Sequence, residues 1–173
     1  MGYFKSYLFL IALVLLFALY ESIIVIMYVK SRFMKIVAGI VFVAIIYLGS
    51  HRNTYLPFLG PTVLPGKLLK ESEKKEGATQ VTLFVEMPDD TPVVYWAAQA
   101  SEGVVFSDPY SAYEDYTNAG VAKVKNNQAI LQISCPSSYK VPSGKTLKPH
   151  VHYRVVYPNG IMGSVQTMWV ACP

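Results

Sequence analysis

The sequence predicts a membrane α-helical hairpin followed by an all-β, antiparallel sandwich. The first fifty residues hold two almost wholly apolar runs, at 7–29 and 33–48. From Thr79 onward the apolar residues recur with a period of two, in short runs separated by turn residues, which is typical of half-buried strands. The chain of 173 residues has room for one ordinary domain plus attachments. We therefore divide it into a hairpin at 1–50, a linker at 51–78 and a sandwich at 79–173.

The first apolar run is interrupted only by Glu21 and Ser22. At 1.5 Å per residue, a helix over this run can cross a hydrocarbon core of roughly 30 Å. A carboxylate inside the span costs free energy, so Glu21 either contacts another helix or subunit or lies at headgroup depth because the span ends near Tyr20.

The uninterrupted apolar part of the second run, 36–48, is short and crosses only if Phe33 and Met34 join it and Lys35 extends to the headgroups. The alternative is one span plus an interfacial or buried helix. The basic loop residues between the runs compete with basic residues on the other side, so the charge rule leaves the orientation open. The loop residues are Lys30, Arg32 and Lys35, and the competing residues are Lys5, Arg52, Lys67 and Lys70.

The linker at 51–78 is rich in proline, glycine and charge, which disfavours helices and central strands. Beyond it, strands are expected from Thr79 and at 93–98, 121–125, 128–134, 149–157 and 164–171. Asn126 and Asn127 form a two-residue turn between the third and fourth of these, because asparagine tolerates positive φ. Long loops are expected at 101–118 and 135–147.

Composition limits the classes of partner. The net charge is +4, and no lysine or arginine cluster is dense enough to predict specific nucleic-acid recognition. The expected partners are a lipid bilayer and other membrane or capsid proteins. The two cysteines, Cys135 and Cys172, each follow a predicted strand and form either a disulfide or two buried thiols.

The strand at 149–157 carries the most suggestive side chains. His150 and His152 are two positions apart, so both project from the same face of the strand. Imidazole is a ligand for iron, copper, zinc and nickel. Tyr139 lies in the loop before this strand, and Gln166 lies on the next strand, where we expect it beside the histidines.

Several segments together resemble the core of the intradiol ring-cleavage dioxygenases. They are 94–103, 117–120, 135–142, 148–153 and 164–167. The resemblance implies a dioxygenase-like sandwich in which His150, His152 and Tyr139 bind Fe(III) and Gln166 lines the active site. Lys148 takes the place of an arginine that precedes the first histidine in the family.

The family has a second tyrosine ligand, in a G-P-x-Y stretch. The only counterpart here, at 59–63, has no tyrosine. A fourth ligand would therefore be a water or one of four tyrosines: Tyr55, Tyr110, Tyr113 and Tyr116. With this departure we expect the fold without the catalysis, and no cofactor unless the site for Fe(III) is intact.

The layout as a whole, with a hairpin, a spacer and a sandwich, resembles the small membrane proteins beneath the capsid of large icosahedral double-stranded DNA viruses of the algal type. That resemblance implies a structural minor capsid protein in the inner membrane of a virion. The alternatives are a membrane-tethered Fe(III) dioxygenase that opens a catechol-like ring, and a membrane-anchored ligand-binding module that uses the tyrosine-rich loop at 110–116.

Overall fold

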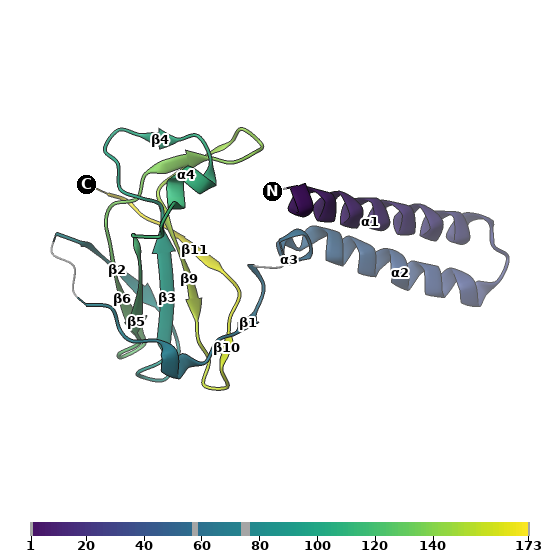
Figure 1. Cartoon of the computed structure of the whole chain (residues 1–173). Helices are drawn as coiled ribbons and strands as arrows, with labels where there is room; N and C mark the ends of the chain where they lie inside the picture. The colour runs from purple at the N-terminus through teal and green to yellow at the C-terminus, as the bar shows by residue number, and fades with distance from the viewer. Residues whose placement is uncertain (1, 57–58, 74–76, 173) are drawn as a thin grey trace. The chain divides into compact units, whose positions relative to one another are not determined.

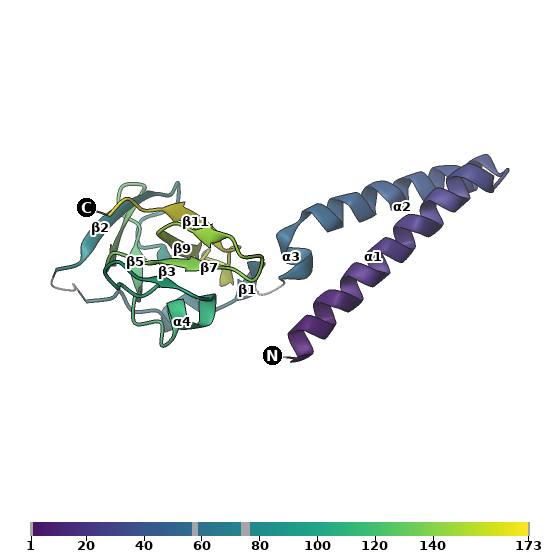
Figure 2. The same cartoon turned by 90° about the horizontal axis from the view of Figure 1, so that it is seen from above.

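The computed structural model describes residues 2–56, 59–73 and 77–172. The chain divides into two compact units, Met1–Gly60 and Pro61–Pro173 (Figures 1 and 2). The first unit is helical and the second is built of β-strands, as the sequence predicts.

The helical unit is an antiparallel pair, α1 (Gly2–Tyr28) and α2 (Arg32–Ser50), followed by the short α3 (Arg52–Tyr55). The Ser31 hydroxyl caps α2 by accepting a hydrogen bond from the Met34 backbone N–H. The stretches Leu8–Tyr28 and Arg32–Ser50 are long and apolar enough to cross a membrane, and only 6% and 11% of their most apolar windows are buried. This exposure is unlike that of a core helix in a soluble protein and disfavours a buried second helix.

The β-unit consists of three layers. The central sheet has the strand order β11 (Gln166–Trp169), β9 (His150–Val155), β3 (Pro92–Ala97) and β5 (Ala119–Lys123), and all its neighbours are antiparallel. One face packs on the antiparallel pair β2 (Thr79–Phe84) and β6 (Gln128–Ile133). The other face carries the short helix α4 (Pro109–Tyr113) and the small sheet of β4 (Val105–Phe106), β7 (Ser138–Lys140) and β8 (Thr146–Leu147).

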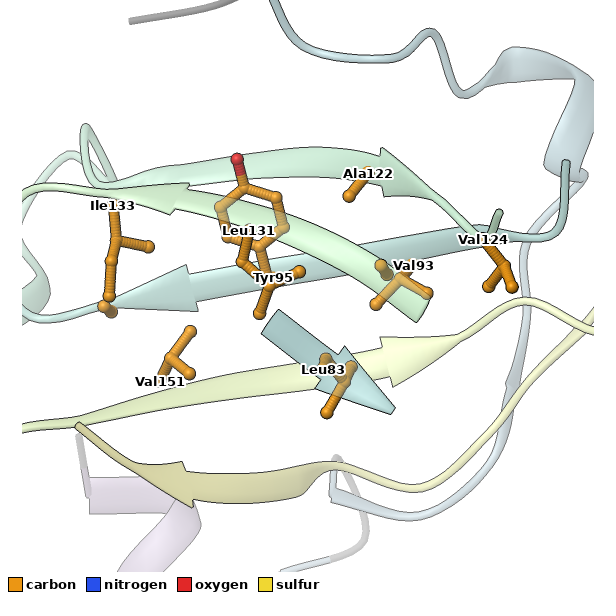
Figure 3. Packing of buried hydrophobic residues seen from close by; sticks show 10 residues of the cluster. Leu83, Val93, Tyr95, Ala122, Val124, Leu131, Ile133 and Val151 are labelled. Atoms are coloured by element: carbon orange, nitrogen blue, oxygen red, sulfur yellow. The ribbon is translucent and has the colours of Figure 1, made fainter. Parts of the chain in front are cut away.

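The main hydrophobic core lies between the central sheet and the β2–β6 pair (Figure 3). Val93 and Tyr95 of β3 and Val151 of β9 meet Leu131 and Ile133 of β6, all with 2% exposure or less. The Tyr95 hydroxyl donates to the Gln132 carbonyl oxygen and accepts from the Gln132 backbone N–H, so one buried side chain joins both sheets.

At Gly120 on β5, the Tyr95 side chain that bridges the two sheets leaves no room for a side chain. A Cβ at Gly120 would collide with the Tyr95 hydroxyl group and the Ser72 Oγ. Only glycine lets β5 pass so close to the tyrosine that bridges the two sheets.

The predicted linker differs from the structure. Part of it belongs to the β-unit, because β1 (Thr62–Val63) pairs with β10 (Ile161–Met162) and Ser72 hydrogen-bonds Val121 through backbone and side chain. The 3₁₀ turn η2 (Gly66–Leu68) lies between these two contacts in sequence. Residues 57–58 and 74–76 of the predicted linker lie outside the described residues. Period-two reasoning missed this segment because its strand is only two residues long.

The predicted long loops also contain structure. The region 101–118 holds β4 and α4, and 135–147 holds β7 and β8. The Asn126–Asn127 turn is as predicted, with φ of 51° and 60°. Strand ends elsewhere lie within a few residues of the expected positions.

A disulfide joins Cys135 to Cys172, with an S–S distance of 2.06 Å and a sequence separation of 37. It ties the segment after β11 to the start of the loop that leads to β7. Of the two states that the sequence leaves open, the structure has the disulfide.

We expect a Cys135→Ser, Cys172→Ser double variant to lose up to about 4 kcal/mol of unfolding free energy, because the unfolded chain regains loop entropy. Denaturant titration of the detergent-solubilised full chain, followed by tryptophan fluorescence, measures this change. Both tryptophans lie in the β-unit, so the signal reports that unit alone. Equal midpoints with and without the disulfide would contradict the expectation.

Candidate functional site

Strand alternation sends the two histidines away from the main core. Val151, Tyr153 and Val155 of β9 pack into the core between the sheets. His150 and His152 therefore project from the opposite face, toward α4 and β7. His150 is 3% exposed, and the two imidazole centroids lie 4.7 Å apart.

Two tyrosine hydroxyl groups meet the imidazole of His150. The Tyr139 Oη, from β7, lies 3.1 Å from His150 Nε2, and the Tyr113 Oη, from α4, lies 3.4 Å from the same atom. The two hydroxyl oxygens are 3.2 Å apart. Three potential ligand atoms thus form a nearly equilateral triangle. It lies between the central sheet and the layer of α4 and the β4–β7–β8 sheet, which we call the covering layer.

The second histidine completes the group of side chains that we call the Tyr2His2 cluster: Tyr113, Tyr139, His150 and His152. The His152 ring lies beside that of Tyr113, with centroids 6.0 Å apart, and beside that of Trp96, at 5.6 Å. Its Nδ1 lies 2.9 Å from the Thr167 Oγ1. This contact fixes the orientation of the His152 ring.

The backbone fixes the ring of His150 in a similar way. Its Nδ1 lies 2.6 Å from the Lys148 carbonyl oxygen, so Nδ1 carries the proton and Nε2 accepts one. Burial lowers the pKa of His150, and the bond to the Lys148 carbonyl opposes that shift. His150 is therefore held as the neutral imidazole, the form that binds metals.

Hydrogen bonds within and around α4 fix this short helix in the covering layer. Asp108 caps α4 by accepting from the backbone N–H groups of Tyr110 and Ser111. Because these bonds favour the carboxylate, that of Ser111 most, they lower the pKa of Asp108. At the end of α4, the Gln99 side chain donates to the Glu114 carboxylate at 2.6 Å. Together these contacts place Tyr113 over the sheet.

The segment that carries Tyr139 is held as firmly. The buried Asn118 side chain donates to the carbonyl oxygens of Ala98 and Ser134 and accepts from the Ser134 backbone N–H. Ser137 donates its hydroxyl to the Ser101 carbonyl oxygen and accepts from the Ser101 N–H. These contacts hold the segment that leads into β7, and with it Tyr139, next to the carboxyl end of β3.

The sequence-predicted residues divide into two groups. His150, His152 and Tyr139 come together as expected, and Tyr113 joins them out of the four tyrosines considered. Tyr110 and Tyr116 are 69% and 56% exposed, although Tyr116 stacks on Tyr113. Tyr55 lies in the helical unit. Sequence spacing gave no means of choosing among them, because α4 was expected to be loop.

The expectation that Gln166 lies beside the histidines is wrong. In the register of β11 on β9, Gln166 faces Tyr153, whereas Thr167 faces His152 and Trp169 faces His150. A shift of one residue moves a side chain to the other face of a sheet. Lys148 has an exposed side chain, and it contacts the cluster through its carbonyl group.

The chemistry of the donors limits what the cluster could bind. Within the described residues, no group of three or more His, Cys, Asp and Glu side chains gathers. The cluster instead offers two phenol oxygens and two imidazole nitrogens. Ligand atoms lie ~2 Å from a transition metal, so two ligands of one metal lie roughly 3 Å apart, as the three atoms of the triangle do.

Proton release must accompany metal binding by the tyrosines. Burial, and then the hydrogen bond to Tyr139, raise the pKa of Tyr113 far above the ordinary value. Without a cation both phenols act as hydrogen-bonding groups in a buried network. A metal with high charge is needed to displace their protons.

Comparison with known proteins adds no assignment. No protein-family model matches the chain, and no curated protein does. The functional argument therefore rests on the geometry of the cluster.

We expect acid to destabilise the metal-free β-unit partly through His150. Its folded-state pKa is below the unfolded value of about 6.5, so its contribution to stability is present above that pH and is lost as the pH falls. In chelator-treated protein, His150→Gln should reduce the slope of unfolding free energy against pH, below pH ~6.5, by up to about 1.4 kcal/mol per pH unit.

Urea titrations at several pH values measure that slope. His51→Gln, in the helical unit, is the control for replacing a histidine outside the β-unit. Identical slopes for His150→Gln and the wild-type chain would contradict the account of a buried, neutral His150.

Proposed function

We propose that the chain is a membrane-anchored protein whose β-domain binds one ferric ion through Tyr113, Tyr139, His150 and His152. The observation that carries the proposal is the convergence of the Tyr139 and Tyr113 hydroxyl groups on His150 Nε2, at 3.1 and 3.4 Å. Phenolates are hard, anionic donors that favour trivalent iron, and imidazole is a common iron ligand. The donor set thus fits the ion that the dioxygenase resemblance implies.

The proposed reaction class is intradiol opening of a catechol-like ring, with both atoms of O₂ entering the product. A bound ferric ion would supply the Lewis acidity and redox capacity for this chemistry. The chain's own residues hold the ion's ligands in place: Thr167 and the Lys148 carbonyl group orient the two imidazoles. Trp169, which is 62% exposed, lies edge-on to the His150 ring at 5.2 Å and offers an aromatic surface next to the site.

A structural role is the second candidate, as a bracket between the inner membrane of a virion and its capsid. Two side chains on the outer face of the β2–β6 pair favour it, since Phe84 and Ile130 are 75% and 51% exposed. Exposed apolar side chains on a sheet face are a surface for neighbouring proteins. The partners in this candidate are other capsid or membrane proteins.

We expect the purified full chain in detergent to bind about one ferric ion per chain and to develop a visible tyrosinate-to-iron absorption band. Tyr113→Phe and Tyr139→Phe should each weaken binding by at least about tenfold, because each removes an anionic ligand. Tyr110→Phe, on the same short helix and exposed, is the matched control and should bind normally. Metal analysis and a ferric titration measure these effects.

The same samples test the reaction. Oxygen uptake and ring-opened dicarboxylate after addition of catechol would support the dioxygenase. Bound iron without turnover would restrict the function to ferric binding. A folded, metal-free chain, or a Tyr113→Phe variant that binds like the wild-type chain, would contradict the ferric site and favour the bracket.

The disulfide also gives a proposed orientation. Disulfides persist in oxidising compartments, so we propose that the β-domain faces one and that the basic loop between α1 and α2 is cytoplasmic. The basic residues alone leave the membrane orientation of the hairpin open, and the proposal selects one of the two orientations.

We expect a cysteine introduced by Ser143→Cys to react with a membrane-impermeant maleimide in intact cells. A cysteine introduced by Ser31→Cys should react only after permeabilisation. Both positions are exposed, so accessibility within the protein does not limit the labelling. The reverse labelling pattern would contradict the proposed orientation.

A further inference from the structure

Among the residues that the structure describes, the Glu21 carboxylate meets no partner. It lies within the apolar stretch Leu8–Tyr28, roughly 10 Å along the helix axis from the end of that stretch. Within the described residues no hydrogen bond or ion pair joins it to another group. The neighbouring Ser22 is satisfied locally, since its hydroxyl donates to the Ala18 carbonyl oxygen at 2.8 Å.

Glu21 also borders a groove between α1 and α2 of ≈ 370 Å³. The groove is otherwise almost wholly apolar, and its lining includes the small residues Ala18, Ser22 and Ala38. None of the lining residues is basic. Glu21 borders the groove with the apolar part of its side chain, and the basic residues of the hairpin loop precede or begin α2.

A carboxyl group at that depth needs a hydrogen-bonding partner, because hydrocarbon offers none. We propose that the partner is Glu21 of a second copy of this chain, and that the hairpins associate as a two-fold dimer through this groove. The inference rests on the proposed membrane crossing, and it is independent of the ferric site.

Three features favour a second copy. Identical spans put the two Glu21 side chains at the same depth whatever the exact position of the bilayer. Two carboxyl groups are self-complementary, since a carboxyl O–H donates and a carboxyl oxygen accepts. Small residues beside them allow close approach of helices, as at other membrane interfaces. A two-fold axis near Glu21 satisfies all three requirements.

The test measures association of the full chain in phosphatidylcholine vesicles. Donor- and acceptor-labelled samples, each labelled at a cysteine introduced by Ser143→Cys, are mixed at increasing lipid-to-protein ratios. Energy transfer should fall with dilution as expected for a monomer–dimer equilibrium. Glu21→Leu should lower the association constant about tenfold, because it removes the interhelical hydrogen bonds.

Two variants make the result specific to the carboxyl group. Glu21→Gln keeps a donor and an acceptor and should retain association within about threefold of wild type. Tyr20→Leu changes the adjacent, exposed side chain and should leave association unchanged. Helix content and resistance to carbonate extraction are checked for every variant.

The proposal would be overturned by a wild-type chain that stays monomeric in vesicles, which would point instead to a foreign helix carrying a basic residue. Equal association of Glu21→Leu and wild type would also overturn it. A chain that carbonate extracts would overturn the membrane anchor and, with it, this dimer. Loss of ferric binding in the same samples would count against the proposed ferric site alone, because the dimer and the membrane anchor do not depend on it.

Discussion

The site depends on one constraint, the alternation of side chains along β9. Val151, Tyr153 and Val155 must face the core between the two sheets, because they supply part of its buried apolar surface. That requirement sends His150 and His152 to the opposite face, away from the β2–β6 pair. The chain covers this face with α4 and β7, and those two elements deliver Tyr113 and Tyr139 to the histidines. Core packing and site assembly are therefore consequences of the same period of two.

The covering layer packs on the central sheet through a small apolar cluster around Ala112 and Tyr113, and polar contacts hold it in addition. Asn118, buried at 4% exposure, joins the end of β3 to the end of β6 through its side-chain amide. The Asp108 cap and the Gln99–Glu114 hydrogen bond orient a helix of only five residues. Glu114 and Tyr116, with φ of 31° and 53°, adopt positive-φ conformations directly after it. Backbone strain next to a buried polar cluster is typical of segments that position functional side chains.

Much of this architecture could be predicted from the sequence. Hydropathy gave the two helices, and alternation gave the strands that carry the core and the face of His150 and His152. Tyr113 could only be placed among four candidates, because its position depends on a short helix fixed by side-chain hydrogen bonds that have no periodic signature. Gln166 was misplaced because register across a ladder depends on tertiary pairing, and a slip of one residue exchanges it with Thr167. The sequence predicts a linker over 62–72, because the contacts of this segment are a two-residue strand pairing and a few hydrogen bonds to distant residues.

The central claim is that Tyr113, Tyr139, His150 and His152 form one ferric site in a membrane-anchored β-domain. X-ray absorption spectroscopy of the iron-loaded full chain tests it most directly, because it reports the atoms around the metal itself. The account predicts a first shell of only nitrogen and oxygen at ~2 Å, with the outer-shell scattering of two imidazoles. Iron surrounded by oxygen alone, without imidazole scattering, would show that the metal is bound elsewhere and would contradict the account.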